Sequence, residues 1–334
     1  MQRALAINEQ VLGATHPSTA ASLNSLGWLR YLQGRDEEAE SFLQRALTID
    51  EQQLGAEHRD TAMSSNHLAL VYTRRGKYKE AESLLQRALA IEEQALGAEH
   101  PDIATILDNL GSLYIRQERY AEAELLRMRA LTIREQQLGA EHPETARGLD
   151  NLALVYVRQG KYKEAEPLYQ RALAIEEQQL GATHPDTAIS LNNLARLYTD
   201  QGKYAEAELL YERALRINEQ ELGTNHPATA SCLNNLASLY QAQGRYGEAK
   251  QLLQHALTIR EQVQGLEHPD TAMSVWWLAV LSVQQQHYQE ARALYQRALA
   301  IYERTLGSED PMTQRIQQDY TALLRTMKQG KATE

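Results

Sequence analysis

The stretch 191–223 reads LNNLARLYTDQGKYAEAELLYERALRINEQELG, and the rest of the chain repeats it. Close copies follow one another at a period of 42 residues, beginning at Leu23, Ser65, Leu107, Leu149, Leu233 and Val275. Self-similarity at a period of roughly 20–50 residues is typical of a solenoid, a propeller or another array. We therefore interpret the 334 residues as a repeat protein rather than as two or three ordinary domains.

Each repeat is predicted to be a helical hairpin. In the first half of the unit, apolar residues at i, i+3, i+4 and i+7 form one stripe of a helix: Leu191, Leu194, Ala195 and Tyr198. Gly202 then interrupts the pattern and supplies a turn. A second stripe follows and ends before Leu222-Gly223: Ala207, Leu210, Tyr211, Ala214 and Ile217. One hairpin cannot bury both stripes alone, so stacking of neighbouring repeats is expected to stabilise the fold.

The pattern resembles the tetratricopeptide repeat. The family's Leu, small residue, Tyr, Ala, aromatic and Ala appear here as Leu194, Ala195, Tyr198, Ala207, Tyr211 and Ala214. The standard repeat has about 34 residues, whereas Glu219 stands here in place of the usual terminal proline and the period is longer. This long form, with LNNLA and QGKYAEAE, resembles the repeat domain of kinesin light chains and related bacterial proteins. The resemblance implies an all-α fold, a right-handed α-solenoid of stacked antiparallel helical hairpins.

We predict a single repeat array over residues 1–328. Residues 1–13 match the end of a second helix, so they form a partial N-terminal repeat. This suggests a fragment of a longer array, or an end that another surface covers. Seven full hairpins are expected over 18–307, followed by a C-terminal capping helix over 310–328, because solenoid ends need a polar outer face. The tail 329–334 is expected to be disordered.

Composition limits the classes of partner. The net charge is −10 and acidic and basic residues are interspersed, which argues against nucleic acid and against an anionic membrane surface. No apolar run of about 18 residues and no signal-peptide pattern occur in the sequence. Cys232 is the one cysteine, so no internal disulfide can form. We expect a cytoplasmic protein in which Cys232 is a small core residue.

Seven histidines recur between the hairpins, at His16, His58, His100, His142, His184, His226 and His268. They do not predict a metal site. Equivalent points on neighbouring helices lie roughly 8–10 Å apart, whereas zinc ligands lie about 2 Å from the ion. We interpret each histidine as part of a turn that organises a helix start, and Asp310 takes the eighth place in the same role.

The sequence contains no recognisable catalytic motif. A phosphate-binding glycine loop, a nucleophile elbow and zinc-type Cys/His spacing do not occur. The glutamate pairs Glu164/Glu166 and Glu206/Glu208 begin second helices, where carboxylates offset the positive helix end. We therefore predict no enzyme activity, no metal and no cofactor.

A second face of the first helices carries the candidate binding site. Asparagine recurs there at Asn109, Asn151, Asn193 and Asn235, which we call the asparagine ladder. The resemblance places this face in a concave groove, and kinesin light chains use similar asparagines to hold the backbone of an extended peptide. An amide suits this role because it both donates and accepts. An adjacent second file contains Asn24, Asn66, Asn192 and Asn234, with Asp108 and Asp150. Two roles are open for it: ligand contact, or hydrogen bonds between helices.

Arginines join the ladder in the middle of the array. Arg74, Arg116 and Arg158 share one register, and Arg147 and Arg196 lie on the same face. An arginine file favours acidic peptides, through charge-assisted and bidentate hydrogen bonds. The alternative is that these arginines are solvated helix ends paired with nearby glutamates.

Two further departures from the repeat pattern are large side chains. Trp276 and Trp277 replace the usual Asn-Asn pair. One is expected to pack against the capping helix and the other to anchor a partner, because tryptophan is enriched at binding hot spots. Arg127 stands where an apolar residue is expected, and we predict that its stem covers the packing surface while its head stays in water.

The sequence thus favours a protein–protein interaction scaffold that binds an extended, acidic peptide in the groove. The first alternative is a structural array that self-associates through the N-terminal end, with Leu5 and Leu12. The second is the sensor region of a larger signalling protein.

Overall fold

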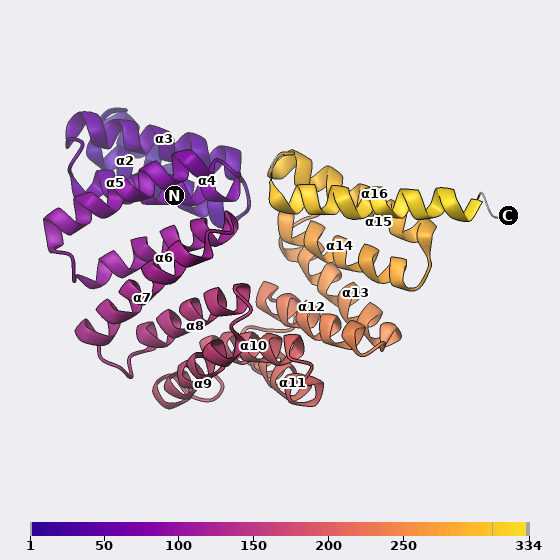
Figure 1. Cartoon of the computed structure of the whole chain (residues 1–334). Coiled ribbons are helices and arrows are strands. Elements are labelled where there is room, and N and C mark those ends of the chain that lie inside the picture. Colours follow the sequence, from indigo (N-terminus) through magenta and orange to yellow (C-terminus); the bar gives the residue numbers. More distant parts are fainter. Residues whose placement is uncertain (1, 309, 332–334) are drawn as a thin grey trace. The chain divides into compact units, whose positions relative to one another are not determined.

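The computed structural model describes residues 2–308 and 310–331, and these residues form helices and short turns without a strand (Figure 1). The helices are α1 (Gln2–Val11), α2 (Pro17–Leu32), α3 (Asp36–Gln53), α4 (Arg59–Arg74), α5 (Tyr78–Leu96), α6 (Pro101–Arg116), α7 (Tyr120–Gln137), α8 (Pro143–Arg158), α9 (Tyr162–Gln179), α10 (Pro185–Asp200), α11 (Tyr204–Glu221), α12 (Pro227–Ala242), α13 (Tyr246–Val263), α14 (Pro269–Gln284), α15 (Tyr288–Thr305) and α16 (Pro311–Lys331). The predicted all-α repeat solenoid is confirmed for the described residues.

The chain divides into two compact units, Met1–Lys161 with α1 to α8 and Tyr162–Glu334 with α9 to α16. Within each unit the packing repeats. In unit 1, α3, α5 and α7 each pack on the first helix of their own hairpin and on the first helix of the next repeat; in unit 2, α11 and α13 do the same, α15 packs on α14 and α16, and α9 packs on α10. Successive first helices also contact one another, α2 with α4, α4 with α6 and α6 with α8 in unit 1, and α10 with α12 and α12 with α14 in unit 2. The first helices therefore lie side by side and present one continuous face in each unit.

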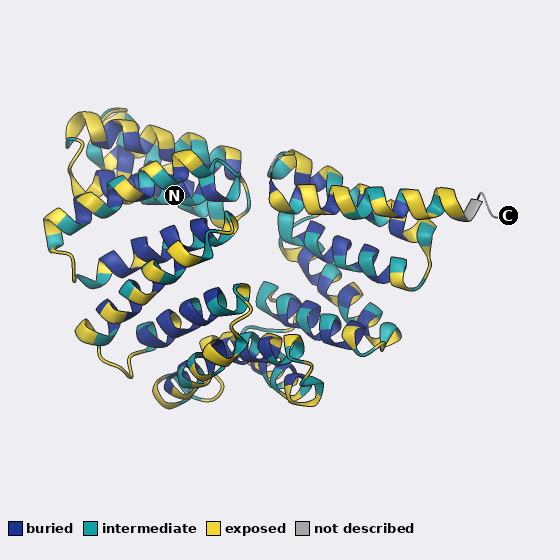
Figure 2. Cartoon of the chain, viewed as in Figure 1, coloured by how far each residue is buried: buried dark blue, intermediate teal, exposed yellow. Residues whose placement is uncertain are grey.

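The predicted stripes form the core. Leu194 and Ala195 of α10 are 4% and 0% exposed, and Tyr211 and Ala214 of α11 are 2% and 0% exposed. Figure 2 shows that buried and exposed stretches also alternate along the other helices. Burying one large aliphatic or aromatic side chain contributes about 1.5–3 kcal/mol. The small alanines allow the helices to approach closely enough for these side chains to be buried.

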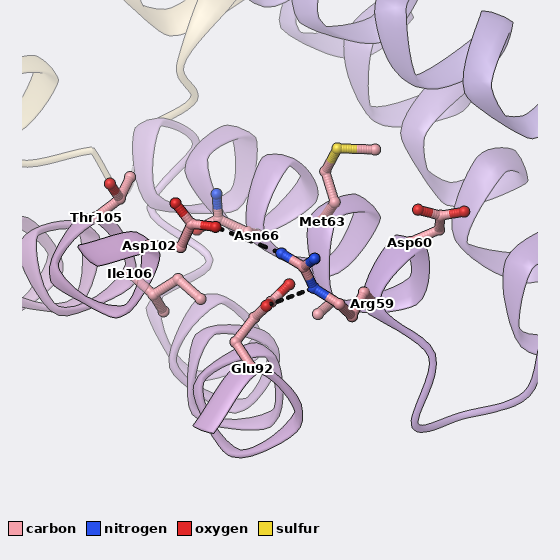
Figure 3. A pocket seen from close by; sticks show the side chains of 9 residues that line it. Arg59, Asp60, Met63, Asn66, Glu92, Asp102, Thr105 and Ile106 are labelled. Carbon is pink, nitrogen blue, oxygen red and sulfur yellow. Dashed lines mark hydrogen bonds and ion pairs between the residues drawn. The ribbon is translucent and has the colours of Figure 1, made fainter. Parts of the chain in front are cut away.

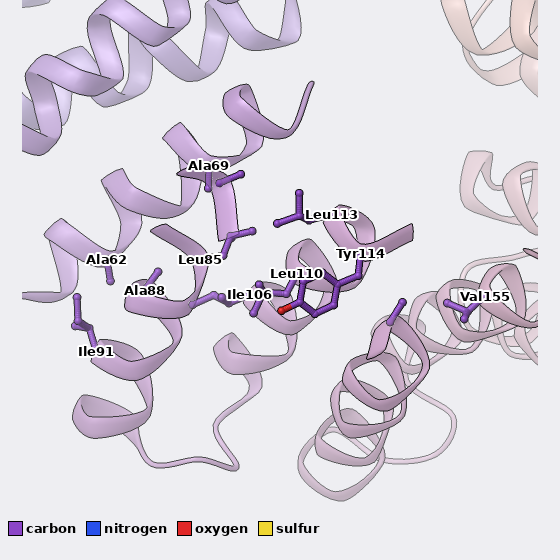
Figure 4. Packing of buried hydrophobic residues seen from close by; sticks show 12 residues of the cluster. Ala62, Ala69, Leu85, Ala88, Ile91, Ile106, Leu110, Leu113, Tyr114 and Val155 are labelled. Carbon is purple, nitrogen blue, oxygen red and sulfur yellow. The ribbon is translucent and has the colours of Figure 1, made fainter. Parts of the chain in front are cut away.

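One cluster in unit 1 shows how the repeats share a core (Figure 4). Ala69 of α4 and Leu85 of α5 are buried together with Leu110 and Leu113 of α6. These helices belong to two successive repeats, so neither hairpin buries its apolar face alone. Stability therefore depends on the contact between repeats, as expected for a solenoid.

The connectors are built as the histidines predict. Each connector histidine accepts, through Nδ1, a hydrogen bond from the backbone N–H two residues further on, at 3.1–3.2 Å. Asp310 accepts through Oδ1 from the backbone N–H groups of Met312 (2.9 Å) and Thr313 (3.1 Å). Capping of helix starts is therefore confirmed for all eight positions. A threonine adds a second bond that was not predicted: Thr187 donates to the Gly181 carbonyl at 2.9 Å.

The turn inside the third hairpin is strained. Glu118 has φ 59°, a left-handed conformation that glycine adopts in other repeats, as Gly202 does with φ 75°. This conformation costs a non-glycine residue roughly 1–2 kcal/mol. We expect Glu118→Gly to raise the free energy of unfolding by about 1 kcal/mol in urea denaturation. Gln117→Gly is the matched control, because Gln117 has φ −88° and gains nothing from glycine. A Glu118→Gly variant no more stable than the wild type contradicts this account.

Helix α16 covers the end of unit 2. Ile316 and Leu323 are 0% and 3% exposed, and they pack in one cluster with Ala298 and Tyr302 of α15. The helix continues to Lys331, so residues 329–331, which were expected to be disordered, are helical. The rest of the predicted tail, 332–334, lies outside the described residues.

Candidate functional site

The asparagine ladder is tied to the second asparagine file by hydrogen bonds between successive first helices. In unit 1, Asn109 donates through Nδ2 to Oδ1 of Asn66 (2.8 Å), and Asn151 donates through Nδ2 to Oδ2 of Asp108 (3.0 Å). Each bond joins residues 43 positions apart. The ladder position of one repeat therefore contacts the second file of the preceding repeat. Of the two roles left open for the second file, hydrogen bonding between helices is confirmed for Asn66 and Asp108.

The same bond recurs in unit 2, where Asn235 donates to Oδ1 of Asn192 at 3.2 Å. Asn193 is half-buried, and it also interacts with another residue. An amide has two donor hydrogens and one carbonyl acceptor. Within the described chain, Asn109, Asn151 and Asn235 use a single donor hydrogen each. Each therefore keeps one N–H and its Oδ1 atom for a ligand.

His67 occupies the ladder register in the second repeat and was not among the predicted site residues. Its Nδ1 lies 2.6 Å from Oδ1 of Asn24, and its ring stacks on Trp28 with centroids 4.9 Å apart. Burial lowers the pKa of His67, so the ring is neutral near pH 7. Asn24 Oδ1 can only accept, so Nδ1–H is the donor. The period is the signal that could have found His67, because it stands 42 positions before Asn109.

The two tryptophans differ in their surroundings. Trp276 is 8% exposed and donates through Nε1 to Oδ2 of Asp319 in α16 at 3.0 Å. Trp277 is half-buried and its ring centroid lies 4.8 Å from that of Trp276. Trp276 thus forms a hydrogen bond with the capping helix. Trp277 keeps more surface that a partner could contact.

Arg74 is held inside the array. Its Nε donates to Oδ2 of Asp36 at 2.7 Å, and its Nη2 donates to Oδ1 of Asp36 and to the carbonyl of Tyr31. The guanidinium also covers the Tyr31 ring, 3.7 Å from the centroid. The Asp36 side chain is 2% exposed. This bidentate pair connects two repeats, so Arg74 is not available to a ligand without breaking it.

The other arginines of the face are exposed. Arg147 pairs with Glu144 in the first turn of α8. Arg116 and Arg196 have no ion pair within the described part of the chain, and Arg158 is exposed but not without a partner. Arg116 and Arg158 each follow a ladder asparagine by seven residues, which places them on the same helix face two turns away. The structure therefore brings Arg116 and Arg158 into line with the unit 1 ladder.

Two arginines are buried around one carboxylate in unit 1. Arg127 donates through Nη1 to Oδ1 of Asp108, and Arg134 donates through Nη2 to Oδ2, both at 2.6 Å. Their exposed fractions are 3% and 2%. The prediction that the head of Arg127 stays in water is wrong, because Asp108 and the Ser112 hydroxyl (2.6 Å) accept from its two terminal nitrogens. Burial lowers the pKa of Arg127, while the charge of Asp108 opposes that effect. Asp108 also accepts from Asn151, so these ion pairs position the ladder.

Glutamates at the starts of the second helices contact the next repeat. Glu166 accepts from the hydroxyl of Tyr198 (3.2 Å), from Gln201 (3.2 Å) and from Lys203 (3.2 Å). Partial burial raises the pKa of Glu166, but the hydrogen bonds from Gln201 and Lys203 outweigh it and the pKa lies below its usual value. Glu208 contacts Arg245 in the same way at 2.8 Å. Glu166 and Glu208 therefore join repeats, whereas the acidic residues in the first turns of α9 and α11 are Glu164 and Glu206.

Cys232 is a buried core residue, as predicted. It is 1% exposed and accepts a hydrogen bond from Nδ2 of Asn218 at 3.1 Å. Burial raises the pKa of the thiol from 9.0 to about 11. At pH 8 the thiolate fraction is then about 100-fold below that of an unperturbed thiol. We expect labelling of the native protein by iodoacetamide to be at least about 100-fold slower than labelling in urea; similar rates contradict the buried environment.

No helix of the described residues is long and apolar enough to cross a membrane. No three His, Cys, Asp or Glu side chains gather as metal ligands in the part of the chain that the structure covers.

The sequence profile of the tetratricopeptide repeat matches residues 1–52, 60–136, 126–178, 144–220 and 201–262, and a second profile of the same description matches 278–311. These matches cover most of the chain. The chain belongs to the tetratricopeptide repeat family. No curated protein matches it.

Solved structures agree with this family. The nearly identical repeats assigned to a kinesin light chain of Podosopora anserina are 31% identical, with 62% of this chain and 98% of that chain covered and a TM-score of 0.51. BtubC (BKLC) from P. vanneervenii is 26% identical over 71% of this chain and 92% of its own, with a TM-score of 0.52. A Rap protein complexed with competence and sporulation factor shares the fold, with 18% identity, 86% and 75% coverage and a TM-score of 0.64. The kinesin-light-chain-like form of the tetratricopeptide repeat is thus confirmed.

Family membership indicates the general class of protein. Tetratricopeptide repeat proteins are generally non-enzymatic scaffolds for protein–protein interaction. The chain is accordingly an interaction scaffold. Its surface residues determine which partner it binds, because a fold does not by itself define a function.

Proposed function

We propose that this scaffold binds an extended peptide segment along the face of the first helices, and that acidic side chains of the peptide contact Arg116 and Arg158. The observation that carries the proposal is the pairing of ladder and arginine in successive repeats. Asn109 and Asn151 each keep an N–H and a carbonyl oxygen, and each is followed two turns later by an exposed arginine. The amides suit a peptide backbone, and the guanidinium groups suit carboxylates.

The spacing of the helices fits an extended ligand. Neighbouring packed helices lie roughly 8–10 Å apart, and an extended chain advances about 3.3 Å per residue. Asn109 on α6 and Asn151 on α8 would therefore hold backbone groups about three residues apart. The Rap protein provides a precedent for partner binding by this fold, since its structure holds the competence and sporulation factor.

The test is selection from a random peptide library on the wild type and on Arg116→Glu/Arg158→Glu. We expect acidic peptides to be recovered by the wild type and lost with the double variant, because the reversed charges repel them. Equal recovery by both proteins would place the site away from these arginines. The matched control is Arg216→Glu/Arg292→Glu, which reverses two exposed arginines on second helices and should recover the same peptides as the wild type.

Self-association is the second candidate, and exposed apolar residues of α1 and of the turn that follows it favour it. Ile7, Val11 and Leu12 are 49%, 72% and 45% exposed, and Leu5 is half-buried beside them. Exposed apolar patches are typical of interaction surfaces. Sedimentation at increasing concentration distinguishes the candidates: a mass that rises in the wild type but not in Val11→Asp supports self-association, whereas a constant monomer mass contradicts it.

A further inference from the structure

Unit 1 contains a cavity of about 360 Å³ between the starts of α4 and α6 and the end of α5 (Figure 3). Neither the ladder nor the arginine file includes it. Its volume falls within the range of about 300–1,000 Å³ that is common for binding pockets. The side chains that define its chemistry are Arg59, Asp60, Met63, Glu92, Asp102 and Ile106.

The cavity carries more negative than positive charge. Asp60, Glu92 and Asp102 line it together with a single cation, Arg59. Arg59 Nε lies 2.9 Å from Oε2 of Glu92, whose side chain is 10% exposed, and Nη2 lies 3.4 Å from Oδ2 of Asp102. Arg59 thus balances the buried carboxylate. The side chains of Asp60 and Asp102 remain 56% and 60% exposed, so each carboxylate is accessible to a further cation.

Beside the carboxylates the cavity has an apolar wall. Met63 of α4 is 43% exposed, and Ile106 of α6 lies in the same lining with 6% exposure. A methionine side chain adapts to the shape of an apolar ligand group. An aliphatic stem ending in a positive charge matches this combination of an apolar wall and an acidic rim, because lysine and arginine place their methylene groups on apolar surface while their charged heads meet polar groups.

The cavity adjoins the ladder. Asn66 lines it and accepts the hydrogen bond from Asn109. Thr105, which also lines it, precedes Asn109 by one helical turn on the same face. A peptide whose backbone contacts Asn109 can therefore direct one side chain into the cavity.

We propose that this cavity binds an arginine or lysine side chain of the peptide held by the ladder, an inference that rests on the proposed function. The methylene groups contact Met63 and Ile106, and the cationic head pairs with Asp102, whereas Asp60 lies on the other side of Arg59 (Figure 3) and adds negative charge to the rim. Arg59 shows that a guanidinium fits between two carboxylates here. The opposite end of α6 carries Arg116, about 21 Å from Asp102 along the helix. The ligand then has a basic residue at one side of the face and acidic residues at the other, which defines its orientation.

The experiment extends the peptide selection to Asp60→Asn/Asp102→Asn. We expect peptides selected by the wild type to carry arginine or lysine at one fixed position. A synthetic copy of such a peptide should bind the variant at least about tenfold more weakly. The control Asp186→Asn/Glu206→Gln neutralises two exposed carboxylates in first turns of unit 2, and it should leave the affinity within about twofold.

The outcomes separate this inference from the proposed function. Acidic peptides without a fixed basic residue would overturn the cavity inference and leave the proposed function standing. A basic preference that persists in Asp60→Asn/Asp102→Asn would also overturn it, because the basic residue then binds elsewhere. If the wild type recovers no peptide, both the cavity inference and the proposed function are contradicted. A methyl-13C signal of Met63 that shifts with the wild-type peptide, and not with a copy carrying norleucine in place of the basic residue, would support the contact directly.

Discussion

Asp108→Ala is expected to lower the free energy of unfolding by about 3–5 kcal/mol. The carboxylate accepts from both Arg127 and Arg134, which are 3% and 2% exposed. Its removal leaves the buried Arg127 without a counter-ion and leaves Arg134 with only Glu144, 4.0 Å from its Nε. The cost of an unpaired buried charge exceeds the gain of any exposed ion pair. Urea unfolding followed by circular dichroism at 222 nm measures the difference.

The matched control for this change lies in the same helix. Asp102→Asn removes an exposed carboxylate of α6 whose contact with Arg59 is 3.4 Å, so the free energy of unfolding should change by no more than about 0.5 kcal/mol. A loss below about 1 kcal/mol for Asp108→Ala would contradict the conclusion that the buried ion pairs hold these repeats together.

Gly111→Ala is expected to lower the free energy of unfolding by about 1–3 kcal/mol, although alanine is the better helix former. A Cβ atom at Gly111 would lie 2.7 Å from Nε of Arg127. Arg127 cannot easily move away, because Asp108 and Ser112 hold both of its terminal nitrogens. The clash therefore disturbs either the helix contact or the buried ion pair. Urea unfolding measures this effect too.

The chain provides two controls for this second prediction. Gly247 of α13 has open space where its Cβ would be, so Gly247→Ala should raise the free energy of unfolding by about 1 kcal/mol. In the second repeat the registers of Gly111 and Arg127 hold Ala69 and Leu85, both buried. Gly111→Ala should therefore lower the free energy of unfolding less in the Arg127→Leu variant than in the wild type. Equal costs in both backgrounds would show that Arg127 is not the neighbour that excludes the methyl group.

The parts of the fold that repeat were predictable from the sequence. Hairpin boundaries, apolar stripes and histidine caps depend on residues within one repeat or in adjacent helices. Leu194 and Ala195, for example, are buried because their spacing matches a helix period. His184 caps α10 because its Nδ1 atom reaches a backbone N–H only two residues away. Such local relations recur every 42 residues, so the sequence displays each of them several times.

Residues that depart from the repeat can be identified in the sequence, but the residues with which they pair cannot. Arg127 was recognised as irregular, yet its partner Asp108 was not. Asp36 begins α3 where the later second helices begin with tyrosine, and its partner Arg74 lies 38 positions away. A long side chain can reach several registers of the neighbouring repeat, and the period alone does not distinguish among them. The same holds for Arg59, whose two carboxylate partners lie on different helices.

The candidate site was predicted only in part, because the period does not identify the partners of its side chains either. The period identifies the ladder face and the register of Arg116 and Arg158. It does not show that Arg74, in the same register, is bound to Asp36. Nor does it show that each ladder amide already donates one hydrogen, as Asn109 does to Asn66. These contacts leave each of Asn109 and Asn151 one N–H and one carbonyl oxygen for the proposed ligand, with exposed arginines on the same face.

A double-mutant cycle tests peptide binding on this face most directly. Its two changes are Arg116→Ala in the protein and alanine in place of the acidic residue of a peptide recovered by the wild type. Calorimetric titration gives the dissociation constants of the four combinations. A contact between the two groups predicts a coupling free energy of about 0.5–3 kcal/mol. A coupling near zero for every acidic residue of the peptide would contradict the placement of the ligand beside Arg116.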